Sequence, residues 1–350
     1  MRNSRFSRQT GAALVIALLV FAIAAALMVG LQRDYQLFLA RVGNSLAAEQ
    51  SWAYLLGAEQ LGIKAIAKDT EIDTAANRQW DHLGELWAAE ATPFPLDEGG
   101  WLLGRLEDLQ GRFNLNLLLS TSDSVEGSTE GEGNASTASF GGGELSAPQQ
   151  QFVRLLMALD LESFSVDEAI ALTERIADYI DTDSERRARG AEQGEYRNLP
   201  QPYYPANRPL VSVSELRAVQ GMSTELYQRL APFVSVWPMQ NAKLNIMTAS
   251  VTVLRSLNID GSLQPMDLAT ATRWVEQRSQ GDIGGLDALL EDVAFTGGET
   301  AQLRMLLGES SHWFLLSAKV ELLGRESQLL SVLERTGATA VSRYRSQGEL

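Results

Sequence analysis

The chain contains no cysteine and only two histidines among its 350 residues. Without cysteine it can have no disulfide bond, no zinc site built on thiolates and no thiol nucleophile. The histidines, His82 and His312, lie far apart in the sequence, which excludes a His-rich metal centre. A single catalytic triad that uses one histidine is not excluded by this count.

Positive charge is also scarce. The chain has 29 Lys and Arg residues against 44 Asp and Glu residues, which gives a formal net charge of −15. Such an acidic protein is poorly suited to nonspecific binding of nucleic acid or of anionic lipid. Hydrophobic residues make up 45% of the chain, which is enough for a substantial core. At this length we expect two or three packed units, or one domain with an insertion.

The strongest positive signal is the apolar run Ala12–Leu31, in which 20 positions carry no charge. A helix of that length spans about 30 Å, the thickness of the hydrocarbon core of a bilayer. Arg2, Arg5 and Arg8 precede the run without any acid, and basic residues before a first span keep the N-terminus cytoplasmic. The sequence therefore predicts a single-pass membrane protein whose main domain lies outside the cytoplasm.

A cleavable secretory signal is the alternative interpretation of this run. The apolar part of such a signal normally has about 7–15 residues and ends at small residues beside a cleavage site. Here the run is longer, and it continues into a pattern typical of one helix face. The apolar positions of that pattern are Tyr35, Leu39, Val42, Leu46, Ala53, Leu56, Ile63 and Ala67. We expect one helix from Ala12 to about Ala67, with this stripe packed against a globular domain.

The N-terminus also resembles a known processing signal. A short basic leader, residues 1–11, ends at Gly11, and the apolar helix begins at Ala12. This arrangement is similar to the class III signal of type IV pilins and type II secretion pseudopilins. The resemblance implies that prepilin peptidase cuts after Gly11 and that Ala12 is then N-methylated. Ile16 stands where the family usually has glutamate, and that replacement is typical of the K-type minor pseudopilins of type II secretion.

Four further segments resemble the K-type proteins. In Trp101–Leu119, two apolar runs surround Gly111, which predicts a strand hairpin with Gly111 in its turn. The residues that carry the resemblance there are Asp108, Gly111, Phe113, Asn114 and Asn116. The other similar segments are residues 178–192, 206–223 and 243–257.

The remaining pattern indicates an α+β fold in which a pilin-like long helix packs on an antiparallel sheet. Residues 32–119 would form the first part of this core, and residues 308–350 would add strands at 313–322, 327–334 and 338–344. Residues 120–146 are rich in Ser, Gly and Glu, which predicts a flexible linker. Residues 147–307 would form a large, mostly helical inserted domain. Its expected helices are 150–161, 166–180 with Ser165 as N-cap, 213–219, 224–230, 249–257, 266–278 and 286–293.

An acidic loop after residue 180 is the clearest candidate for a metal site. Its carboxylates are Asp178, Asp181, Asp183, Glu185, Glu192 and Glu195. Several hard oxygens brought to one point suit calcium, but Arg186 stands where a true EF-hand needs glycine. The same acids could instead pair with Arg186, Arg187 and Arg189 on a solvated surface, and spacing leaves both interpretations open. The K-type resemblance implies structural calcium in the helical domain.

Two other functions receive little support from the sequence. Residues 213–230 and the segment from Lys243 resemble helix-hairpin-helix units, which in other proteins bind DNA phosphates. Arg217, Arg229 and Lys243 are the few cations there, so we expect a packing role and no nucleic acid. No GxSxG motif or phosphate-binding loop occurs, so we expect no enzymatic activity.

The resemblance implies a minor pseudopilin that caps the tip of the type II secretion pseudopilus and is needed for protein export across the outer membrane. It would be held in the inner membrane by residues 12–31, with its main domain in the periplasm, until assembly. Its expected partners are the I, J and H types of minor pseudopilin and prepilin peptidase, with the secretin and exported proteins as further candidates. The assembly surface would include Ile16, Tyr35, Leu39, Val42 and Leu46. The alternative is a tip or adhesion subunit of a type IV or DNA-uptake pilus.

Overall fold

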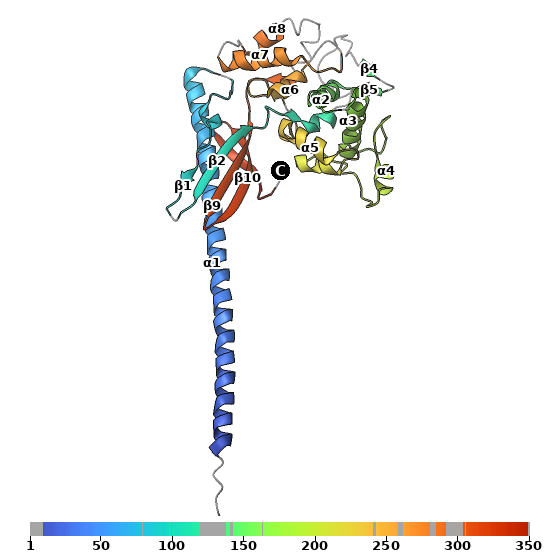
Figure 1. The fold of residues 1–350 in the computed structure, drawn as a ribbon. Coiled ribbons are helices and arrows are strands. Elements are labelled where there is room, and N and C mark those ends of the chain that lie inside the picture. The colour runs from blue at the N-terminus through green and yellow to red at the C-terminus, as the bar shows by residue number, and fades with distance from the viewer. Residues whose placement is uncertain are drawn as a thin grey trace, which may run out of the picture.

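One long helix carries two packed units in the computed structural model of this protein (Figure 1). We name them the sheet unit, which packs on the second half of the long helix, and the helical unit, which is inserted between two strands of the sheet. The structure describes residues 10–78, 80–97, 99–119, 138–140, 143–162, 164–240, 243–257, 262–280, 285–291, 304 and 306–348.

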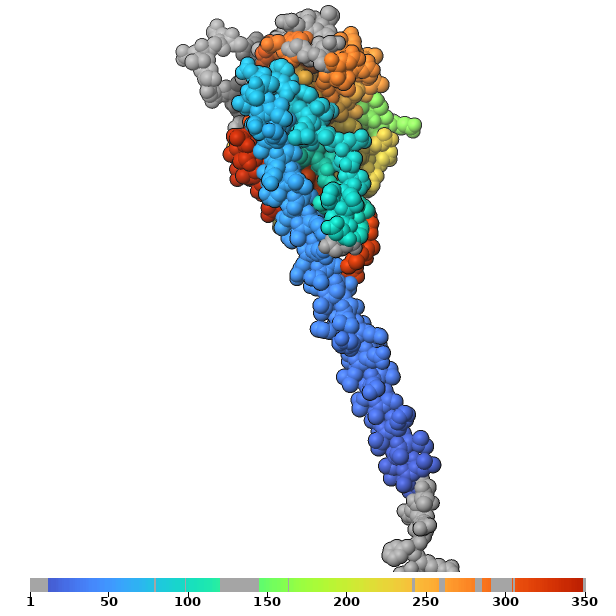
Figure 2. Space-filling view, turned by 90° about the vertical axis from the view of Figure 1, so that its left-hand side faces the viewer, coloured from blue at the N-terminus to red at the C-terminus, as the bar shows by residue number. Residues whose placement is uncertain are grey.

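Helix α1 runs without interruption from Thr10 to Ala76, a length of 67 residues. It confirms the predicted single helix and extends it by nine residues at its end, from 67 to 76. Every residue from 12 to 46 is exposed, and Ala47 is the first buried position. Figure 2 shows this first half standing clear of the rest of the described chain. By length and composition, it is the one described helix that could cross a membrane.

The face of α1 that packs on the sheet is not the predicted stripe. Ala53 of that stripe is exposed, and Leu56 and Ile63 are only half-buried. The buried positions are Ala47, Ser51, Leu55, Ala58, Glu59, Gly62, Ile66, Asp69 and Asp73. A pattern read from apolar residues alone overlooks this face, because several of its members are polar and one is glycine. At Gly62 a Cβ atom would lie 3.3 Å from Leu316 Cδ1, so the missing side chain lets helix and sheet approach closely.

The sheet has five antiparallel strands in the order β1-β2-β9-β10-β11. They are β1 (Phe94–Pro95), β2 (Trp101–Asp108), β9 (Trp313–Leu322), β10 (Arg325–Thr336) and β11 (Thr339–Ser346). Side chains alternate along β9, so that every second residue from Phe314 to Leu322 is buried in the core facing α1. The three C-terminal strands and the α+β pilin-like fold are therefore confirmed.

A buried ion pair also joins α1 to the sheet. Arg345 donates to both carboxylate oxygens of Glu59 at 2.7 Å, and Ser331 Oγ donates to the same group at 2.6 Å. Burial would raise the pKa of Glu59, but these donors outweigh that effect and hold its pKa below the ordinary value. The carboxylate therefore stays charged inside the helix–sheet interface.

The predicted hairpin in Trp101–Leu119 is wrong. Strand β2 ends at Asp108 and pairs with β9, whereas the next strand, β3 (Phe113–Asn114), pairs in parallel with β6 (Val234–Ser235) in the helical unit. Leu115–Leu119 then forms the 3-10 helix η2. Phe113 is 1% exposed within the core of the helical unit. Two apolar runs on either side of a turn give the same sequence pattern in both cases. The second run can pair with the first in one sheet, or it can enter the core of another unit.

The helical unit contains the helices that the sequence predicts, with shifts of up to four residues at the described ends. They are α2 (Ala147–Met157), α3 (Val166–Ile180), η3 (Val213–Ala218), α5 (Thr224–Leu230), α6 (Val251–Arg255), α7 (Leu268–Ser279) and α8 (Gly285–Glu291). The structure adds two short helices that were not predicted, α4 (Gln193–Arg197) and η4 (Ala231–Phe233). Ser165 is confirmed as a cap, because its Oγ accepts from Glu168 N at 3.3 Å. The segment 213–218 is a 3-10 helix rather than an α-helix.

Short strands complete the unit. β7 (Leu244–Asn245) pairs in parallel with β8 (Leu307–Gly308), and β4 (Ala138–Phe140) pairs with β5 (Gly143–Leu145). The last pair lies within the segment expected to be a linker. Of that segment, residues 120–137 and 141–142 lie outside the described residues.

The helical unit is inserted between two neighbouring strands of the sheet. The chain leaves the sheet after Asp108 and returns at Trp313, and Leu109 N donates to Trp313 O at 3.0 Å. Entry and exit therefore lie side by side, which lets an inserted unit fold without disturbing the sheet. Figure 1 places the helical unit at the end of α1 farthest from the apolar segment.

Candidate functional site

Three carboxylates of the predicted acidic loop meet at the end of α3. Asp178 lies in the last turn of α3, Asp181 is its C-cap, and Glu192 is the N-cap of α4. One oxygen from each lies within 4.8 Å of the others, and all three residues are buried. We name this group the loop carboxylate cluster.

The other three predicted ligands stay outside the cluster. Asp183 and Glu185 are exposed, and Asp183 Oδ1 accepts from Glu185 N at 2.8 Å. Glu195 Oε2 accepts from Glu192 N at 3.0 Å in a capping box that starts α4. The structure therefore brings together three of the six candidate carboxylates.

Arginines also pair with these acids, as the alternative interpretation expected. Arg187 Nη1 lies 2.5 Å from Asp178 Oδ1 and 2.5 Å from Asp181 Oδ2. Arg189 instead donates its backbone N–H to Glu174 at 2.5 Å and pairs with Asp167 at 3.0 Å. The loop cluster thus has three carboxylates and one contacting guanidinium, so its formal charge is −3 plus 1, or −2.

The electrostatics of the loop cluster favour an additional cation. The last turn of α3 has no basic residue, although the C-terminal end of a helix carries partial negative charge. Burial, together with the charges of Asp178 and Asp181, raises the pKa of Glu192 to about 7. Asp181 Oδ1 is buried without a hydrogen-bond partner among the described residues. These hard oxygen donors are the kind that calcium prefers.

Glycine and aromatic residues shape this loop, and the sequence interpretation did not assign them a role. A Cβ atom at Gly190 would overlap Asp178 Oδ2, so only glycine lets the loop close over that carboxylate. Beneath it, the ring of Tyr196 lies 5.7 Å from that of Tyr179 and 5.2 Å from that of Tyr203. A glycine between acidic residues was the only sequence signal for this closure.

The helix-hairpin-helix-like segment contributes to the core of the helical unit. Leu216 of η3 and Leu226 and Leu230 of α5 are buried there. Arg217, one of the few cations of the segment, stacks over the ring of Tyr227 at 5.5 Å. These contacts are what the predicted packing role requires.

A buried polar network joins the two units where the chain crosses between them. Asn245 Nδ2 donates to Asp81 O at 3.2 Å, to Asp108 Oδ2 at 3.3 Å and to Ser311 Oγ at 2.8 Å. Ser311 and Thr248 also donate their hydroxyl groups to Asp108. Burial raises the pKa of Asp108 to about 6 despite these donors. No arginine or lysine makes an ion pair with Asp108 among the described residues.

The residues that carry the K-type resemblance lie around this crossing. At Gly111 a Cβ atom would lie 2.7 Å from Thr248 Oγ1, which requires glycine. Asn114 Nδ2 donates to Pro238 O at 2.6 Å. Asn116 Nδ2 donates to the backbone oxygens of Leu210 and Val236, each at 3.0 Å. Their amide groups therefore satisfy backbone atoms that the short strands leave unpaired.

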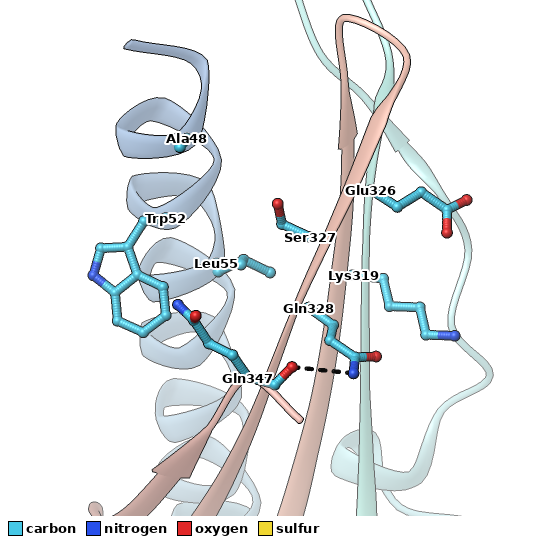
Figure 3. A pocket seen from close by; sticks show the side chains of 8 residues that line it. All are labelled: Ala48, Trp52, Leu55, Lys319, Glu326, Ser327, Gln328 and Gln347. Atoms are coloured by element: carbon cyan, nitrogen blue, oxygen red, sulfur yellow. Dashed lines mark hydrogen bonds between the residues drawn. The ribbon is translucent and has the colours of Figure 1, made fainter. Parts of the chain in front are cut away.

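The candidate assembly surface lies on the free half of α1. Its five residues are Ile16, Tyr35, Leu39, Val42 and Leu46, and their exposed fractions lie between 48% and 63%. Where α1 joins the sheet unit, a hollow of about 480 Å³ opens between Trp52 of α1 and the strands β9 and β10 (Figure 3). Its polar lining residues include Lys319, Glu326 and Ser327.

The predicted processing residues, Gly11 and Ala12, lie at the start of α1. Ala12 is exposed. Cleavage after Gly11 and methylation of Ala12 stay predictions.

Comparison with known proteins gives consistent matches. Residues 111–239 match the family model "Type II secretion system (T2SS), protein K". The chain is 33% identical to type II secretion system protein K of Pseudomonas aeruginosa, over 93% of this chain and 89% of that protein. It is also 33% identical to the protein of the same name from Aeromonas hydrophila, over 81% of this chain and 85% of that protein.

A solved structure has the same fold. It belongs to a GspK-GspI-GspJ complex from the type 2 secretion system of enterotoxigenic Escherichia coli. The match has a TM-score of 0.68 and 25% sequence identity, and it covers 89% of this chain and all of that one.

Proposed function

This chain belongs to the type II secretion system protein K family and is a minor pseudopilin, and on that premise we propose that it caps the tip of the pseudopilus. The observation that carries the proposal is the place of the helical unit. It lies at the end of α1 that is farthest from the apolar segment, with α3 and α5 beside the sheet unit and α7 and α8 at the top, where a subunit above would have to stack (Figure 1). Asn245 of this unit contacts Asp81, just after α1 ends.

The assembly surface supports the same proposal. Residues 12–46 make no buried contact within the chain, so this half of α1 is free to pack against the helices of other subunits. The E. coli relative is found with GspI and GspJ, and we propose the I, J and H types as the neighbours of this chain. Ile16 supports a position with no subunit above, because an unpaired carboxylate in an apolar environment is costly and serves only where a partner exists.

Single cysteines offer a direct test, because the chain has none of its own. We expect Leu39→Cys to cross-link to an I- or J-type pseudopilin that carries a partner cysteine. Glu162→Cys, on the exposed surface of the helical unit, is the matched control and should give no adduct with another pseudopilin. An adduct from position 162 would contradict the tip position.

We propose that the chain is held before assembly in the inner membrane by residues 12–31, with its main domain in the periplasm. Prepilin peptidase would cut it after Gly11. The expected result is that Gly11→Val keeps the leader on the protein, seen as a larger band on a gel, and abolishes secretion. Gly30→Val, within the same helix and with open space around it, is the control and should be processed normally. Normal processing of Gly11→Val would contradict the pilin-like route.

We propose further that the loop carboxylate cluster holds a structural calcium ion. Asp178, Asp181 and Glu192 would be the protein ligands. Calorimetric titration of the full chain in detergent should detect this ion, and Glu192→Gln should weaken it at least about tenfold. Glu185→Gln is the control. Glu185 is one of the six predicted ligands, but it is exposed and lies outside the cluster, so this variant should keep the affinity for calcium. Equal loss in both variants would contradict the assignment of the three ligands.

The role proposed is one of assembly rather than catalysis. Its support is that the matched relatives carry the names of secretion-system components. Contact with the secretin and with exported proteins is part of the same proposal, because the tip is the end that meets them.

A further inference from the structure

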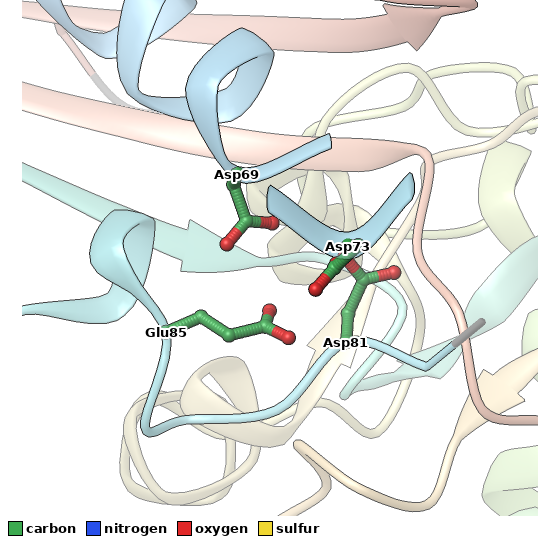
Figure 4. A group of neighbouring side chains, drawn as sticks. All are labelled: Asp69, Asp73, Asp81 and Glu85. Atoms are coloured by element: carbon green, nitrogen blue, oxygen red, sulfur yellow. The ribbon is translucent and has the colours of Figure 1, made fainter. Parts of the chain in front are cut away.

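A second group of buried carboxylates lies in the sheet unit, where α1 ends. Asp69 and Asp73 lie in the last two turns of α1, and Asp81 and Glu85 lie in the segment that follows. One oxygen from each of the four lies within 4.8 Å of the others. Figure 4 shows the four carboxyl groups turned toward one another. We name this group the core carboxylate cluster.

The core cluster is almost closed to solvent. The four residues are between 1% and 8% exposed. Burying several ionised carboxylates is costly unless cations or hydrogen-bond donors compensate each of them. The contacts of each oxygen therefore decide whether the cluster is complete as it stands.

Two guanidinium groups contact the core cluster. Arg335 of β10 lies 3.2 Å from Asp69 and 2.6 Å from Asp81, and Arg78 lies 3.1 Å from Asp73. Four carboxylates and two arginines leave a formal charge of −4 plus 2, or −2.

One oxygen of Glu85 has no hydrogen-bond partner among the residues that the structure describes. Its Oε2 accepts from Trp87 Nε1 at 2.7 Å and from His82 N at 3.2 Å. Its Oε1 is buried without a hydrogen bond, and the nearest ring nitrogen, His82 Nε2, is 3.7 Å away. Figure 4 shows the carboxyl group of Glu85 turned toward the other three acids. A buried oxygen without a donor needs an explanation, and a bound cation would supply one.

We propose that the core carboxylate cluster is a second divalent-cation site, with Asp69, Asp73, Asp81 and Glu85 as ligands. A divalent ion would balance the remaining charge of −2 and give Glu85 Oε1 a partner. Four carboxylate oxygens within 4.8 Å of one another are the hard donors that calcium prefers.

The site would tie three parts of the chain together. Its ligands come from α1 and from the segment after it, and Arg335 attaches them to β10. Asp81 also reaches the helical unit, because its backbone oxygen accepts from Asn245 and its Oδ2 accepts from Ser311 N at 2.6 Å. An ion held here would stiffen the end of α1 next to the crossing between the two units.

The test is terbium luminescence together with calcium calorimetry on the full chain in detergent, at a pH well above 7. Terbium replaces calcium and is excited through nearby aromatic rings. Trp87 contacts the core cluster, whereas Tyr179 lies beside Asp178 of the loop cluster. We use the Glu192→Gln background, in which the loop site is weakened, so that the two sites are separated.

In that background we expect one calcium site to remain, with terbium emission excited through tryptophan. Adding Glu85→Gln should weaken this site at least about tenfold and remove that emission. Glu90→Gln, an exposed glutamate five residues further on, makes the same charge change and should leave both signals intact. Glu85→Gln removes charge from a crowded cluster, so we expect the variant to fold, and its melting temperature in chelator reports this.

Two outcomes would overturn the proposal. One is that the Glu192→Gln protein binds no calcium and shows no tryptophan-excited terbium emission. The other is that Glu85→Gln, folded by its melting temperature, binds calcium as tightly as Glu90→Gln. Neither outcome decides the loop site. That site is tested separately, by comparing calcium binding to the Glu192→Gln protein with calcium binding to the unchanged chain.

Discussion

The two carboxylate clusters each gather buried acids with fewer arginines than acids, but their surroundings differ. The loop cluster joins three acids and one arginine in the helical unit, and the core cluster joins four acids and two arginines in the sheet unit. Each keeps a formal charge of −2. The arginine of the loop cluster is 26% exposed, whereas the two of the core cluster are 11% (Arg335) and 34% (Arg78) exposed. The comparison teaches that equal charge deficits need not depend equally on each arginine, because solvent screens an exposed guanidinium better than a buried one.

The largest expected effect is the loss of a cluster arginine. Arg335→Met leaves the buried carboxylates with one cation fewer, and we expect it to lower the free energy of unfolding by about 3–5 kcal/mol. Arg187→Met should cost about 1–2 kcal/mol, because this guanidinium is 26% exposed and solvent screens its charge. Chemical denaturation of the full chain in detergent with chelator measures both.

Arg343→Met is the control for these variants, because Arg343 is 51% exposed and pairs with Glu334 on the surface. We expect it to cost less than about 1 kcal/mol. If Arg335→Met lowers the free energy of unfolding no more than Arg343→Met does, the comparison fails. Arg335 would then contribute no more than an arginine on the surface.

Asp108 sharpens the comparison, because hydroxyl and amide donors rather than arginines surround it. Burial raises its pKa from 3.8 to about 6, so the folded state binds this proton more tightly than the unfolded state. The contribution of Asp108 to stability therefore falls as pH rises from about 4 to 6, by about 3 kcal/mol in all, and stays constant above. We expect Asp108→Asn to remove this part of the pH dependence.

The measurement is the pH dependence of unfolding for Asp108→Asn, compared with Asp97→Asn on the exposed surface. Asp97→Asn should keep the slope of the unchanged chain. Identical slopes in the two variants would mean that Asp108 does not carry a raised pKa.

Glycine packing should have a smaller effect. Gly190→Ala places a methyl group on Asp178 of the loop cluster, and Gly111→Ala places one against Thr248 at the crossing. We expect each to lower the melting temperature by an amount that corresponds to about 1–3 kcal/mol, with Gly190→Ala the larger. Gly194→Ala in α4 has open space and should be neutral or slightly stabilising. Equal stability of all three variants would contradict the close approach at residue 190.

The smallest effects come from neutralising one acid in each cluster. In chelator, Glu192→Gln and Glu85→Gln should each raise the free energy of unfolding by up to about 1 kcal/mol, because each removes a buried charge without a full partner. With calcium present, each variant should become less stable than the unchanged chain. Melting temperatures in chelator and in calcium measure this reversal. If calcium reverses the stability change of Glu192→Gln but not that of Glu85→Gln, the two clusters differ and the core cluster binds no calcium.

The long helix, the three C-terminal strands and helix α3 were predictable because their signals are local. The apolar run at 12–31, the alternation along 313–322 and the Ser165 cap each depend on residues within a few positions of one another. The loop cluster was partly predictable for the same reason. Its three acids lie within 15 residues, from 178 to 192, and the spacing marked them as candidates.

The core cluster was not predicted, although its acids are also near one another in sequence. Asp69 and Asp73 are four residues apart on a helix, and such acids normally face solvent. Their burial follows from the approach of Arg335 and Trp87, which the local pattern does not indicate. The hairpin error has a similar origin. The side chain of Phe113 fits either unit, and the turn at Gly111 against Thr248 decides which unit it enters.

By itself the sequence determined that the chain begins with one long helix, the apolar segment of that helix at 12–31, the helices and strands with strong periodicity, and the family resemblance. Tertiary structure alone decided which face of α1 is buried, which carboxylates meet and where the chain crosses between units. The physical reason is that periodicity and caps depend on neighbours along the chain, whereas a buried polar residue depends on its partner in space. Glu59 is buried on α1 because Arg345, 286 residues away, reaches it.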